Sequence, residues 1–73
     1  MQKQCLNDNC YNVTKQLAKT QQFLASIPQY IEDANKANNS RVVQVWQTIQ
    51  TDEEKHAELL HELLATEVKN NRF

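Results

Sequence analysis

The stretch VVQVWQTIQTDEEKHAELLHELLATE at residues 42–67 decides the fold, because one row of positions runs through it at helical spacing. Steps of four and three residues keep side chains on a single face of an α-helix. The stretch therefore predicts one long helix. Its inward row is apolar on both sides of a polar middle and consists of Val42, Trp46, Ile49, Glu53, His56, Leu60, Leu63 and Glu67.

The polar middle of this row is Glu53 followed by His56. A carboxylate and an imidazole three residues apart on a helix point the same way and can contact each other. Burying them without partners would cost about 2–7 kcal/mol for a neutral polar group, and more for a charge. We therefore expect a metal ion, a partner across an interface, or access to solvent to offset that cost.

The first half of the chain carries a row with the same spacing, which predicts a first helix over about residues 6–37. Pro28 allows two alternatives: a continuous helix that kinks there, or a break with Ser26 as the N-cap and Gln29 completing a capping box. We favour the kinked helix because the row keeps its phase across Pro28. Thr20 alone is polar in this row, whose members are Leu6, Cys10, Val13, Leu17, Thr20, Leu24, Ile27, Ile31 and Ala34.

A turn at residues 38–40 is expected to join this helix to a second one over about residues 41–69. Asparagine can take the left-handed conformation that ends a helix, and either Asn39 or Ser40 can cap the next one. A capping box beginning at Thr51 is an alternative start, although the unbroken row argues against it. The short connection makes the helices antiparallel, and counting outward from the turn places Thr20 level with His56.

Size and composition favour an assembly of two such hairpins. Residues 1–73 form one domain without a single glycine, which argues against tight β-turns and a sheet. A chain this short builds a thin core and usually needs a staple or an oligomer. We therefore expect an all-α fold, an antiparallel two-helix hairpin that forms a homodimeric four-helix bundle.

Charge and hydropathy exclude several classes of partner. The net charge is −1 with both signs interspersed, so we expect no nucleic-acid binding. Apolar runs are far shorter than the roughly 18–20 residues of a membrane span. The N-terminus has no apolar segment of a signal peptide, so we expect a cytoplasmic protein with reduced thiols.

The two cysteines and the remaining polar residues suggest no catalytic centre. Cys5 and Cys10 match no zinc pattern. At helical spacing they do not face each other, so no disulfide is expected between them. Cys10 is expected to be a small buried apolar residue. With no nucleophile constellation and no glycine-rich loop, we do not expect an enzyme.

The segment Glu53-Glu54-Lys55-His56-Ala57, followed by Leu59-Leu60 and Leu63-Leu64, resembles the ferritin-like superfamily, in particular its rubrerythrin branch. In that superfamily a Glu-x-x-His on the second helix of a hairpin binds a di-iron or di-manganese centre. The resemblance implies a ferritin-like hairpin with Glu53 and His56 as metal ligands. It also requires a bridging glutamate on the first helix, where this chain has Thr20, so a di-iron centre is not expected.

Three hypotheses for Glu53 and His56 follow. Two copies of the pair in a homodimer could hold one divalent ion: iron, manganese or zinc. Alternatively, the protein is a metal-free interaction module, such as a small coat, scaffold or regulatory protein. In that case Thr20, Glu53 and His56 form a buried polar layer that fixes the register. In the third case the helix is rotated and both side chains face solvent; His61 is expected at the surface in every case.

Overall fold

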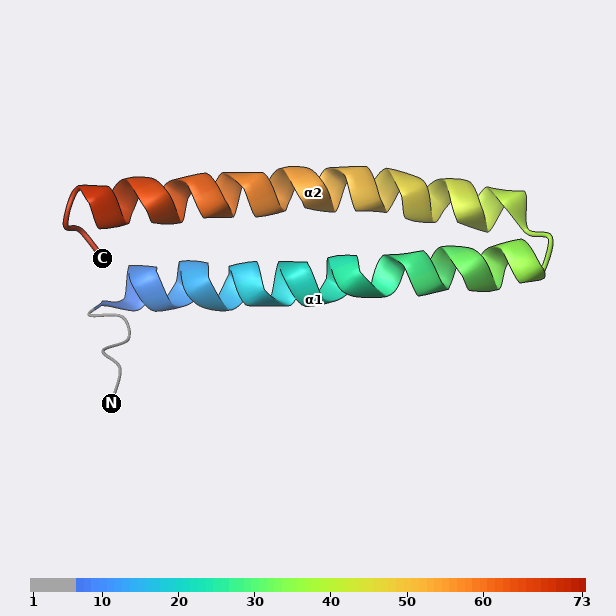
Figure 1. Ribbon diagram of the computed structural model, residues 1–73, viewed down its shortest axis with the longest axis horizontal. Helices are drawn as coiled ribbons and strands as arrows, with labels where there is room; N and C mark the ends of the chain where they lie inside the picture. Colours follow the sequence, from blue (N-terminus) through green and yellow to red (C-terminus); the bar gives the residue numbers. More distant parts are fainter. Residues whose placement is uncertain (1–6) are drawn as a thin grey trace.

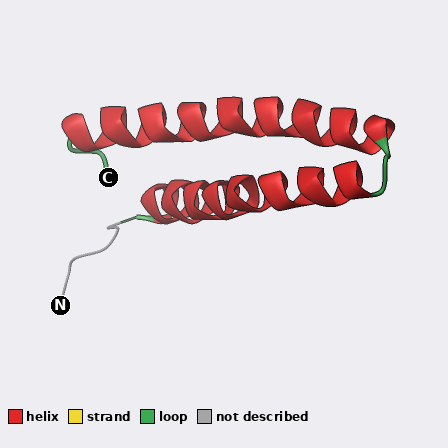
Figure 2. Cartoon of the chain, turned by 45° about the vertical axis from the view of Figure 1, so that its right-hand side comes forward, coloured by secondary structure: helices red, strands yellow, loops and turns green. Residues whose placement is uncertain are grey.

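The protein is a hairpin of two long antiparallel helices, seen in a computed structural model that describes residues 7–73 (Figure 1). Helix α1 runs over Asp8–Lys36 and helix α2 over Ser40–Lys69. They lie side by side along their whole length in both ribbon views (Figures 1 and 2). The described part of the chain contains no strand, so the expected all-α hairpin is confirmed.

Helix α1 continues through Pro28 without a break. The Ser26 hydroxyl donates to the Gln22 carbonyl at 3.2 Å and does not cap a new helix. Residues of the predicted row are buried on both sides of the proline, among them Thr20, Ile27 and Ala34. Burial of this row offsets the cost of about 3 kcal/mol that a proline imposes inside a helix.

The start of α1 corrects the expectation for the cysteines. The Asn7 side chain caps the helix by accepting from the Cys10 N–H at 2.8 Å. Cys10 is buried as expected, but it is disulfide-bonded, so the expectation of a reduced thiol is wrong. Helical spacing from Leu6 onward was the basis for expecting no disulfide, whereas α1 begins at Asp8. The other cysteine of the sequence, Cys5, lies outside the described residues.

The turn consists of residues 37–39 and uses asparagine where other chains use glycine. Asn38 is left-handed, with φ of 57°, and its N–H donates to the Asn35 carbonyl at 3.0 Å. The Asn39 N–H donates to the Ala34 carbonyl at 3.0 Å, which completes a Schellman motif. Asn39 then caps α2, because its side chain accepts from the Val42 N–H at 3.2 Å.

The open end of the hairpin is tied by its last residues. Asn71, with φ of 58°, ends α2 in the same way as Asn38 ends α1. The Arg72 Nε lies 2.9 Å from the Glu67 carboxylate, and Asn7 Nδ2 donates to the Arg72 carbonyl at 3.0 Å. The contact between Asn7 and Arg72 joins the start of α1 to the residues that follow α2.

Helix α2 is rotated relative to the prediction. The row of α2 that is half-buried against α1 alternates in steps of three and four residues, but Val42, His56 and Leu63 of the predicted row are exposed. We call the half-buried row the inner row. Its members are Val43, Trp46, Gln50, Glu53, Ala57, Leu60, Leu64 and Glu67.

Aromatic packing anchors the inner row to α1 near the turn. The Trp46 ring lies 4.8 Å from the Tyr30 ring and 6.4 Å from the Phe23 ring, measured between centroids. Such aromatic pairs contribute about 0.5–1.5 kcal/mol beyond the area that they bury. The largest fully buried side chains over residues 7–73, Ile27 and Thr20, lie on α1.

Candidate functional site

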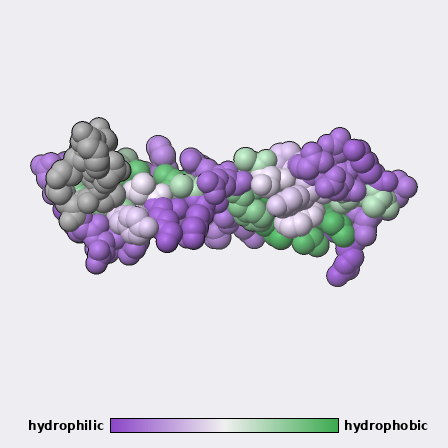
Figure 3. All heavy atoms as spheres, turned by 90° about the horizontal axis from the view of Figure 1, so that it is seen from below, coloured by the Kyte–Doolittle hydropathy of each residue, from purple (hydrophilic) through white to green (hydrophobic). Residues whose placement is uncertain are grey.

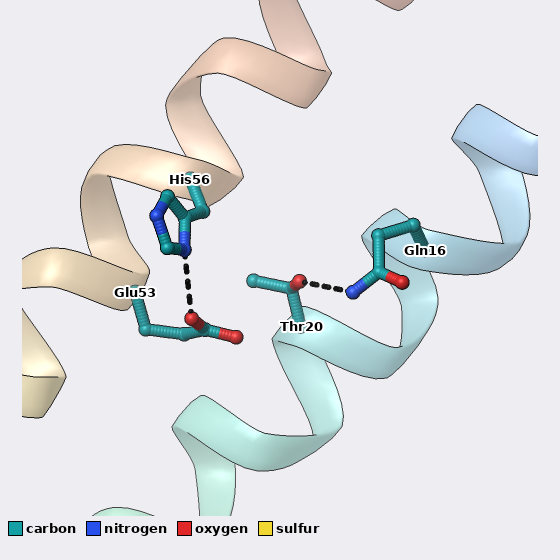
Figure 4. Close-up of polar contacts among 4 residues, drawn as sticks. All are labelled: Gln16, Thr20, Glu53 and His56. Carbon is teal, nitrogen blue, oxygen red and sulfur yellow. Dashed lines mark hydrogen bonds and ion pairs between the residues drawn. The ribbon is translucent and has the colours of Figure 1, made fainter.

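Four polar side chains from both helices meet halfway along the hairpin (Figure 4). On α2, the His56 Nδ1 lies 2.9 Å from the Glu53 Oε1. On α1, the Gln16 Nε2 donates to the Thr20 Oγ1 at 3.2 Å, and Thr20 is only 1% exposed. Together with Leu59 and Leu60 these residues line a groove of about 280 Å³. The expected meeting of Thr20 with Glu53 and His56 is therefore confirmed.

The two predicted ligands differ in burial. The Glu53 side chain is 19% exposed and belongs to the inner row, whereas the His56 side chain is 60% exposed and lies at its edge. The imidazole reaches its neighbour's carboxylate along the helix surface. Neither the fully inward pair nor the fully solvent-facing pair is observed, because the rotation of α2 buries one residue and exposes the other.

A single hairpin does not complete a metal site over residues 7–73. No group of three or more His, Cys, Asp or Glu side chains gathers there in a way that could hold an ion. Glu53 and His56 supply two donors, and Thr20 stands where a third, acidic donor would be needed. Zinc takes about four ligands and magnesium-like ions about six. His61 is exposed, as expected, and borders a different groove with Glu58 and Glu62.

Helix α2 carries a second row, which the predicted row did not separate from the inner row. It runs beside the inner row with the same three-and-four spacing, and all its members are exposed except Ile49, which is half-buried. Val45 is 49% exposed, Leu59 64% and Leu63 43%. We call it the outer row, and its members are Val42, Val45, Ile49, Asp52, His56, Leu59, Leu63 and Thr66. The sequence signal for it is the adjacent apolar pairs Val42-Val43, Val45-Trp46, Leu59-Leu60 and Leu63-Leu64.

Grooves accompany the outer row along the hairpin. One of about 320 Å³ near the turn is lined by Tyr30 and Val42 among others. One of about 300 Å³ at the open end is lined by Val13 and Leu63 among others. With the central groove they form a series on this side of the molecule. Figure 3 views the hairpin from the side of α1 and shows hydrophobic side chains gathered over the half nearer the turn.

The opposite edge of α2 has a different character. The residues on that side of the inner row are mostly polar: Gln44, Gln47, Thr51, Glu54, Glu58, His61, Ala65 and Val68. The hairpin therefore has a hydrated edge and an apolar edge. An apolar edge that stays uncovered in an isolated chain is a candidate contact surface.

No family model matches this chain, and neither does any curated protein or solved structure. The resemblance to ferritin-like proteins thus rests on the motif around Glu53 and His56. Neither helix over residues 7–73 is long and apolar enough to cross a membrane.

Proposed function

We propose that the protein functions as a self-associating helical module. Two hairpins pack with their outer rows facing each other and form a four-helix bundle, with Thr20, Glu53 and His56 at its midplane. One observation carries the proposal: no residue of α2, which the structure describes throughout, is fully buried, although α2 has two apolar rows. A helix with two apolar rows needs a neighbour on each of them.

The area of the hairpin supports the same proposal. The accessible surface of the chain is 5763 Å², whereas a compact monomer of 8.5 kDa has about 4,700 Å². The excess of about 1,000 Å² is close to the ~800 Å² that each partner buries in a standard stable interface. A second copy of the chain would cover an area of this size.

The polar layer gives this module its specificity. Over residues 7–73 no buried side-chain nitrogen or oxygen lacks a hydrogen-bond partner, so the layer is satisfied within the hairpin. Polar groups inside an apolar seam specify register and partner at some cost in stability. Thr20 and Glu53 would serve this purpose within each hairpin, by disfavouring a register of α1 against α2 that slides the apolar layers over them.

Thermal unfolding at several protein concentrations tests the proposal. A dimer that unfolds to two chains gains stability by mass action, so its Tm rises with concentration. We expect a rise of about 5–10 °C over a roughly hundredfold range of concentration. A Tm that does not change over this range would refute self-association, since a monomer's midpoint is independent of concentration.

The second candidate function is binding of a divalent metal ion by two hairpins. It is favoured by the contact between the His56 Nδ1 and the Glu53 carboxylate. In a neutral imidazole that donates from Nδ1, the lone pair of Nε2 is free to bind a metal ion. Histidines that bind metals commonly donate their other N–H to a carboxylate in this way. Two copies would supply two Glu53 and two His56 around one iron, manganese or zinc ion.

Calorimetric titration with Zn²⁺, Mn²⁺ and Fe²⁺ distinguishes this second function from the first. If the metal binds, we expect one ion per two chains and a loss of at least about tenfold in affinity in the His56→Ala variant. His61→Ala is the matched control, because His61 lies on the hydrated edge of the same helix. Equal affinity of His56→Ala and the unsubstituted chain would eliminate the metal site and leave the interaction module.

A further inference from the structure

We infer that the second copy pairs through α2 against α2, antiparallel, with the two-fold axis passing between Asp52 and His56. This inference rests on the proposed function, since it specifies how two hairpins meet. It concerns the outer row, whose members are all exposed in the hairpin except the half-buried Ile49. It names the residues that would face each other across the interface.

The spacing of the outer row carries the inference. Its steps alternate between three and four residues, as at the two core positions of a coiled-coil heptad. In an antiparallel coiled coil, an a position of one helix lies level with a d position of its partner. When the outer row is aligned about its midpoint with the same row of an antiparallel second copy, four kinds of layer result. They are Val42 with Thr66, Val45 with Leu63, Ile49 with Leu59, and Asp52 with His56.

Every layer of this arrangement joins compatible side chains. The layers of Val45 and Ile49 are wholly apolar, and by symmetry each occurs twice. Asp52 meets His56 of the second copy, an acid opposite a base. Since the His56 Nδ1 is already held by Glu53, the other ring nitrogen is the one that would face Asp52. A protonated imidazole donates at both nitrogens and so would join the two carboxylates.

Other arrangements of the same two helices create mismatches. A parallel pair in register places Asp52 against Asp52, and juxtaposed like charges at an interface are destabilising. An antiparallel pair shifted by one heptad places Val45 against His56 and Ile49 against Asp52. A shift in the other direction places Asp52 against Leu63. Each shift buries a charged group against an apolar one, which is unfavourable.

Disulfide trapping between two tagged variants of the full chain tests the register. We expect Val45→Cys mixed with Leu63→Cys to form a disulfide-linked heterodimer under mild oxidation, because these positions share a layer. Val45→Cys mixed with Leu59→Cys is the matched control. In this arrangement position 45 lies level with position 63 of the second copy, and position 59 lies one helical turn away from position 63. Mass spectrometry of the linked peptides separates the new bond from bonds of the native cysteines.

The outcomes of trapping separate this inference from the proposed function. Preferential linkage of position 45 to 63 supports the antiparallel register. Linkage of Val45→Cys to itself shows a parallel pair, and preferential linkage of 45 to 59 shows a shifted one; either result overturns the inference. A dimer detected by sedimentation without any of these links also overturns it, while leaving self-association intact. A sample that sediments as a monomer overturns both.

Discussion

Leu59→Glu is expected to dissociate the dimer and raise its Kd by at least about 100-fold. Leu59 is 64% exposed in the hairpin, so the hairpin itself loses little by the change. Burying one leucine side chain contributes about 1.5–3 kcal/mol, and a symmetric interface contains it twice. Losing about 3–6 kcal/mol corresponds to a factor of about 100 to 10⁴ in Kd. Sedimentation over a range of concentrations measures this change directly.

Val68→Glu is the matched control for this experiment. Val68 is 57% exposed on the same helix but lies on the hydrated edge, outside the outer row. The Val68→Glu substitution introduces the same charge at a similar exposure. We therefore expect the dimer Kd of this variant to stay within about threefold of the value for the unsubstituted chain. Equal Kd values for Leu59→Glu and the unsubstituted chain would mean that the outer row is not the interface.

Trp46→Ala is expected to cost about 3–5 kcal/mol in the free energy of unfolding. The Trp46 ring packs against Phe23 and Tyr30 and joins the two helices near the turn. A domain of 73 residues has a total stability of about 4–11 kcal/mol, so this loss removes much of it. Urea unfolding followed by circular dichroism at fixed protein concentration measures the change.

Tyr11→Ala provides the comparison, because Tyr11 is an aromatic residue of α1 that is 57% exposed. Its ring lies 5.5 Å from the Lys15 Nζ, a contact that contributes about 0.5–1 kcal/mol at an exposed site. We expect a loss of no more than about 1 kcal/mol. Similar losses for Trp46→Ala and Tyr11→Ala would show that the aromatic cluster does not stabilise the hairpin.

The hairpin could be predicted because local signals agreed with each other. The row of α1 kept its phase across Pro28, and its members Thr20, Ile27 and Ala34 are buried as that row requires. Asn38 supplied the left-handed turn conformation in a chain without glycine. Where spacing, turn chemistry and burial indicate the same arrangement, the sequence suffices.

The rotation of α2 could not be predicted, because two apolar rows lie next to each other on this helix. Spacing alone does not say which of them faces α1. The prediction placed Ile49 and His56 in the inward row by their spacing. The structure places Gln50 and Ala57 in the inner row, where a small side chain such as Ala57 lets two helices approach closely.

This rotation also explains why the site was only partly anticipated. Counting outward from the turn correctly brought Thr20 level with Glu53 and His56. It did not show that the imidazole would lie at the edge and bond its own chain's carboxylate. The exposure of His56 depends on which row α1 covers, and that is decided by packing between helices rather than by local sequence.

Sedimentation equilibrium of the full chain tests most directly the central claim, that the hairpin is half of an assembly. We expect a mass of twice 8.5 kDa, with dissociation only on dilution. The apolar outer row and the excess accessible surface both favour this result. A mass of 8.5 kDa at the highest concentration reached would contradict the claim, because α2 would then keep its apolar edge exposed in solution.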